Sequence, residues 1–169
     1  MIKKIILFAF ITLITSLTTI IFAQDSDVDS DSLECTNVFN QFSDAFENSK
    51  YTEALAKWRI CIASCPKVGL NLYINGAKVL SNLIKSETDE QRKQELIDTL
   101  MYLYDIRISS FGNEGKVLGY KAEDMLLYQP LKTDDIYSIL SKSVTLEGAK
   151  SRGGVLSAYF SVATDKYKK

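Results

Sequence analysis

Residues 51–66 read Y-T-E-A-L-A-K-W-R-I-C-I-A-S-C-P and contain the only tryptophan of the chain. Ala54, Trp58 and Cys61 follow one another at steps of four and three residues, which places them on one face of a helix. Pro66 lacks a backbone N–H and therefore predicts the end of that helix. Small residues on both sides of one large indole let a second helix approach closely, so we expect this helix to pack against a partner.

The residues before this run predict the partner helix. Asp31 and Glu34 have the spacing of a capping box, so the partner helix should begin near Ser32. Its apolar face repeats at helical spacing and consists of Val38, Phe39, Phe42, Ala45 and Phe46. The polar connection at residues 48–50 is short, which forces the two helices to lie antiparallel as a hairpin.

The N-terminus has the layout of a secretory signal peptide. Residues 1–23 begin with two lysines, continue through an apolar run and end at Ala23, after which we expect cleavage. An uncleaved N-terminal membrane anchor is the alternative, because the apolar run is long for a signal. We therefore predict an exported protein, periplasmic or extracellular, with no stable membrane insertion once the signal is removed.

An acidic stretch, residues 24–34, follows the signal and offers almost nothing to bury, so we interpret it as a disordered Asp/Ser linker. Its alternating aspartates also suggest a calcium loop. Such a loop needs glycine at its sixth position and glutamate at its twelfth, where counting from Asp25 gives Ser30 and Thr36. The linker is the favoured interpretation.

Two cysteines meet in the predicted hairpin. Cys35 and Cys65 lie at equal distances on either side of a turn near Lys50, so antiparallel packing brings them side by side. Because an exported chain meets oxidising conditions, we predict a Cys35–Cys65 disulfide, with Cys61 left as a small buried thiol. A Cys61–Cys65 bond within one helix would strain the bridge geometry.

Further helices are expected after Pro66, which gives about seven in all after the signal segment. The pattern predicts a third at 70–85, a fourth from a Thr88 capping box to Phe111 and a fifth at 116–128. A sixth should be capped by Thr133 and a seventh should begin near Arg152. The apolar face of the last helix continues almost to the end, so either it packs on its own neighbour or the natural chain is longer.

The second helix resembles that of a tetratricopeptide repeat, a helix-turn-helix unit of about 34 residues. The positions that carry or extend the resemblance are Tyr51, Ala54, Trp58, Cys61, Pro66, Gly76 and Gly119. Gly76 follows Phe42 by 34 residues, whereas Gly119 follows Gly76 by 43. The resemblance, to the exported bacterial envelope type, implies an all-α right-handed solenoid of stacked antiparallel hairpins over 35–169. An unrelated helical bundle is the alternative.

The resemblance also implies a binding groove along the first helix of each hairpin. Its expected lining residues are Phe39, Ser43, Tyr73, Ala77, Tyr120 and Glu123. Such grooves hold peptides through aromatic contacts and hydrogen bonds. The alternative is that Phe39 and Tyr73 are core residues between helices. The family's peptide-carboxylate clamp is not reproduced, so the ligand type stays open.

Composition excludes several functional classes. Removing the signal takes two of the 20 basic residues and none of the 21 acidic ones, which leaves a mild excess of negative charge. We therefore expect no electrostatic attraction to nucleic acid or to an anionic membrane. Histidine is absent, which excludes histidine bases and most catalytic zinc sites. We expect no cofactor, no metal and no catalysis. The predicted function is protein or peptide binding at the cell envelope; the alternatives are an assembly subunit or the N-terminal part of a longer repeat protein.

Overall fold

The computed structural model describes residues 27–168, and side-chain burial from Leu33 onward. The chain divides into two units, Met1–Glu34 and Cys35–Lys169, and the packing below belongs to the second. Within the described residues every regular element is helical and no strand occurs, which confirms the all-α fold class. The predicted signal peptide, residues 1–23, lies outside the described part of the chain.

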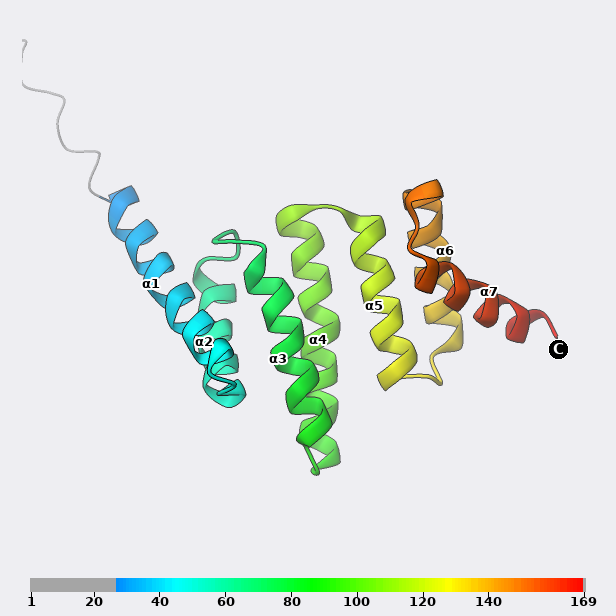
Figure 1. The fold of residues 1–169 in the computed structure, drawn as a ribbon, viewed down its shortest axis with the longest axis horizontal. Coiled ribbons are helices and arrows are strands. Elements are labelled where there is room, and N and C mark those ends of the chain that lie inside the picture. The colour runs from blue at the N-terminus through cyan, green and yellow to red at the C-terminus, as the bar shows by residue number, and fades with distance from the viewer. Residues whose placement is uncertain (1–26, 169) are drawn as a thin grey trace, which may run out of the picture. The chain divides into compact units, whose positions relative to one another are not determined.

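Short connections join the helices, and Figure 1 shows α3 and α4 side by side. The described part contains seven α-helices and one 3-10 helix: α1 (Asp27–Glu47), α2 (Tyr51–Ser64), α3 (Asn71–Ser86), α4 (Glu90–Phe111), α5 (Glu114–Tyr128), α6 (Thr133–Glu147), η1 (Gly148–Lys150) and α7 (Gly153–Tyr167).

Thr133 does not cap the sixth helix as predicted. Helix α6 begins at Thr133 itself, its N-cap residue is Lys132, and no side chain caps it.

Two further helix starts differ from the prediction. Helix α1 begins at Asp27, earlier than Ser32, so most of the acidic stretch that we interpreted as a disordered linker is helical. Helix α4 is capped by Asp89, whose carboxylate accepts from the backbone N–H of Arg92 at 2.8 Å, and not by Thr88. Aspartate at the N-cap also suits the positive end of the helix dipole.

The first hairpin forms as predicted. Ser49 takes a left-handed backbone conformation in the turn between α1 and α2, with φ of 57°. Nζ of Lys57 lies 2.7 Å from Oε1 of Gln41 across the hairpin. At its open end Cys35 and Cys65 form a disulfide, with their Cα atoms 5.7 Å apart, while Cys61 is a free buried thiol. Both cysteine predictions are confirmed.

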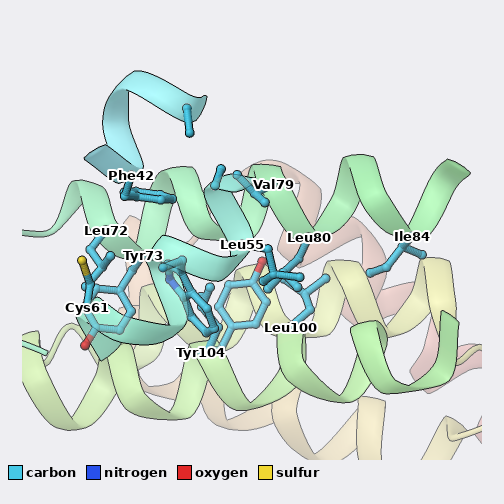
Figure 2. Packing of buried hydrophobic residues seen from close by; sticks show 14 of the residues in the cluster. Phe42, Leu55, Cys61, Leu72, Tyr73, Val79, Leu80, Ile84, Leu100 and Tyr104 are labelled. Atoms are coloured by element: carbon cyan, nitrogen blue, oxygen red, sulfur yellow. The ribbon is translucent and has the colours of Figure 1, made fainter. Parts of the chain in front are cut away.

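A first hydrophobic core joins α1 through α4 and includes Val117 of α5. Trp58 is 2% exposed and lies against α3 at Gly76. Figure 2 shows the side chains of Phe42, Tyr73 and Leu80 in this core. Ala54 and Cys61 are fully buried in it, and Tyr51 packs against it. The small-large-small face of α2 therefore docks against a second helix, as the sequence predicts.

A second core joins α5, α6 and α7 through Ala122, Met125, Ile136, Leu140, Val155 and Val162. Helix α7 packs back on α6 and α5, which was one of the two expected arrangements. A further part of its apolar face stays uncovered within the described residues, since Phe160 is 74% exposed and Leu156 is 43% exposed.

Gly76 and Gly119 do not play equivalent parts. A Cβ added at Gly76 would meet Trp58 of the preceding helix α2, whereas one added at Gly119 would meet Val155 of α7 at 2.9 Å and Ser143 of α6 at 3.2 Å. A Cβ at Gly76 would also meet a side chain of α4, so Gly76 packs between α2 and α4, whereas Gly119 packs against α6 and α7. Both glycines permit close helix packing.

None of the helices between residues 27 and 168 has an apolar stretch long enough to cross a bilayer. The question of an N-terminal anchor concerns residues 1–23, outside that range.

Replacing Gly76 with alanine should destabilise the protein. The new Cβ would overlap Nε1 of Trp58 and would lie 3.1 Å from Cδ1 of Leu103. The indole is enclosed and cannot move freely, so we expect the free energy of unfolding to fall by about 1–3 kcal/mol in urea titrations. Gly153→Ala is the matched control, because its Cβ would meet nothing within 4 Å. Equal stability of Gly76→Ala and wild type would contradict the close packing of Trp58 on α3.

Candidate functional site

The residues expected to line one groove fall into two sets. Phe39 and Ala77 are partly buried and pack against the first core. The Ser43 hydroxyl donates to the carbonyl oxygen of Phe39, 3.0 Å away in its own helix. Tyr120 also packs against that core, but its ring further contacts α4 and the segment before α7, and Glu123 pairs with that same segment.

Tyr73 is a core residue, which corrects its assignment to the groove. Its side chain is fully buried, and its ring meets Phe111 edge-on with centroids 5.6 Å apart. Its hydroxyl donates to the carbonyl oxygen of Pro66 at 2.7 Å and lies 3.0 Å from Oγ of Ser110. Burial raises the pKa of Tyr73. The groove position that the resemblance implied for Tyr73 is thus wrong, because α4 covers this face of α3.

Tyr120 stands at the centre of the remaining set. The guanidinium carbon of Arg152 lies 4.0 Å from the centre of the Tyr120 ring, and that of Arg107 lies 5.6 Å from it. Arg152 also forms an ion pair with Glu123. We call the following residues the Tyr120 cluster: Tyr104, Arg107, Tyr120, Glu123, Asp124 and Arg152.

Arg107 is the unusual member of the Tyr120 cluster. It is only 9% exposed, yet within residues 27–168 its guanidinium forms no ion pair and no hydrogen bond. A buried charge without a carboxylate partner is costly, and its contact with the Tyr120 ring offsets only about 0.5–2 kcal/mol. The guanidinium nitrogens nevertheless keep contact with solvent. Among the described residues, Trp58 Nε1 is the one side-chain N or O atom that is both fully enclosed and without a hydrogen-bond partner. A recessed, solvent-accessible cation suits an anionic group from outside the chain.

Tyr104 and Asp124 tie α4 to α5 beneath this cation. The Tyr104 hydroxyl donates to Oδ2 of Asp124 at 2.6 Å. Burial raises the pKa of Asp124, while the hydrogen bond from Tyr104 lowers it. Burial also raises the pKa of Tyr104, and the charge of Asp124 raises it further. The two groups satisfy one another, which makes them a structural pair and leaves neither as a free acid or base.

Sequence reasoning found Tyr120 and Glu123 but missed the arginines and the Tyr104–Asp124 pair. Arg107 follows the apolar stripe of α4 at helical spacing, Leu100, Leu103, Arg107, and a charge in that position was the available signal. Arg152 carried no comparable signal, because it lies in the connection before α7 and reaches Tyr120 only through the tertiary fold.

The cluster offers no metal site. No group of three or more acidic or cysteine side chains converges in a metal-binding arrangement anywhere from residue 27 to 168. The chemistry available is recognition: the cluster holds two cations, two tyrosine rings and two carboxylates, and both carboxylates are already paired.

The sequence was also compared with known proteins. It matches no protein-family description and no curated protein sequence. The resemblance to tetratricopeptide repeats therefore rests on the residues quoted from the chain itself.

Replacing Tyr104 with phenylalanine should raise the pKa of Asp124 further, because the hydroxyl stabilises the carboxylate. When the pKa of a carboxyl is higher in the folded protein than in the unfolded chain, the protein loses stability as pH rises from the unfolded pKa through the folded pKa. The deficit of the variant should therefore be small near pH 4 and reach about 1–3 kcal/mol at neutral pH. NMR titration of Asp124 and urea unfolding at both pH values test this.

Tyr102→Phe is the control for this substitution. Tyr102 lies on the same helix and is 61% exposed, so its variant should match wild type at both pH values. An unchanged or lower pKa of Asp124 in Tyr104→Phe would contradict the assigned role of the hydroxyl.

Proposed function

We propose that the protein is a non-enzymatic, exported protein of stacked helical hairpins, similar to tetratricopeptide-repeat proteins, that binds a protein or peptide at the cell envelope. The observation that carries the proposal is Arg107. This cation is recessed beside an aromatic ring and lacks an acidic partner among the described residues. An acidic side chain or terminal carboxylate of a partner would supply the missing charge, while Tyr120 would offer apolar contact.

The neighbouring residues support binding more than catalysis. Arg152 is held by Glu123, and the Tyr104 hydroxyl is committed to Asp124. The chain has no histidine, and no nucleophile in the cluster lies beside a free base. The proposed role is therefore that of an adaptor.

Export is supported by two independent features. The first is the sequence of residues 1–23, which resembles a signal peptide. The second is the Cys35–Cys65 pairing, which suits an oxidising compartment because disulfides persist mainly there.

A peptide-display library with free C-termini tests the binding role directly. We expect selection on the native protein to enrich acidic peptides. Arg107→Gln should bind the selected peptides about 10–100-fold more weakly, the effect of losing a charged hydrogen bond. Tyr120→Leu should also weaken binding, since the aromatic contact is lost.

Lys116→Gln is the matched control, because it removes an exposed cation from the same helix as Tyr120 without touching the cluster. The melting temperature of each variant establishes that it remains folded. Absence of any enriched peptide, or equal binding by Arg107→Gln, would count against the proposal.

A further inference from the structure

A pocket of about 330 Å³ lies among α4, α5 and α6, and it shares no residue with the Tyr120 cluster. Met101, Met125 and Ile139 supply its apolar lining. Methionine side chains are flexible and polarisable, so they adapt to apolar groups of different shape. The volume falls at the lower end of the range for ligand sites and is sufficient for a single amino-acid side chain with part of its main chain.

Gln129 is the nearly buried polar residue of this pocket; Ser138, the other uncharged polar residue of its lining, is exposed. Gln129 lines the pocket and is only 9% exposed. Its side-chain amide makes no hydrogen bond to any residue between 27 and 168, and its atoms are not sealed from solvent. A nearly buried amide without a protein partner is uncommon, because each such group costs about as much as a lost hydrogen bond. Its free donors and acceptor are thus available to whatever enters the pocket.

The charged residues around the pocket do not select strongly for either sign. Nζ of Lys121 is already held by Oδ1 of Asp105 at 2.6 Å. Lys132 and Asp135 add one further charge of each sign. A charged ligand would gain little here, whereas an unpartnered amide in a pocket also lined by methionines matches a peptide group that carries an apolar side chain.

We propose that this pocket binds one apolar residue of a partner polypeptide, such as leucine. The side chain contacts Met101 and Met125, and the peptide group pairs with the amide of Gln129, which donates to a carbonyl oxygen and accepts from an N–H. The inference does not depend on the role proposed for Arg107, since the two surfaces use different residues and different chemistry.

The probe that tests it is N-acetyl-leucine-N′-methylamide, titrated into the whole protein and followed by NMR. Shifts should appear at the methyl groups of Met101 and Met125 and at the side-chain amide of Gln129, with weak affinity typical of a fragment. The corresponding glycine compound should bind at least tenfold more weakly, because it lacks the side chain. No shift at these groups, or equal binding of the glycine compound, would overturn the proposal.

Gln129→Met keeps the length of the side chain and removes its amide. We expect this variant to bind the leucine compound about tenfold more weakly, whereas Arg107→Gln should bind it as wild type does. Unchanged affinity in Gln129→Met would overturn the assignment of the amide. Failure to enrich acidic peptides would count against the role of Arg107 and would leave this result unchanged, so the failures of the two proposals are distinguishable.

Discussion

The contact between Trp58 and Gly76 is the constraint on which the rest of the first core depends. The indole lies almost fully buried against α3, and only a residue without a side chain leaves room for it. The indole N–H is sealed there without a hydrogen-bond partner among the described residues, a cost of about 1–3 kcal/mol. The apolar area buried by the ring offsets that cost. The ring of Trp58 connects α2 to α3, and the Cys35–Cys65 disulfide connects α2 to α1. These two contacts together position three helices.

A second feature of the described fold is that its two hydrophobic cores meet at the interface between α4 and α5. Polar contacts occupy much of that interface: Tyr104 bonds Asp124, Lys121 bonds Asp105 and Arg107 lies over Tyr120. Hydrogen bonds and ion pairs are directional, so they fix how α5 sits against α4. They also leave charged groups near the surface between two apolar regions, where a partner can reach them.

The sequence predicted the local structure better than the site. Helical spacing, a short turn and a proline were sufficient for the first hairpin and for the Cys35–Cys65 pairing, because these depend on neighbours along the chain. The resemblance to repeat proteins assigned Tyr73 to a groove although it is core, and helical periodicity could not show which side of α3 would be covered. The cluster around Tyr120 depends on Arg107 and Arg152 meeting across three segments, and no local pattern encodes such a meeting.

The most direct test of this account is the exposure of Trp58, the only tryptophan of the chain. Acrylamide quenching of its fluorescence should be weak in the native protein and should rise sharply when the protein unfolds in urea. The native emission should also lie at shorter wavelength than that of the unfolded chain. If the native indole is quenched as readily as the unfolded one, Trp58 is not enclosed between helices and the account is contradicted.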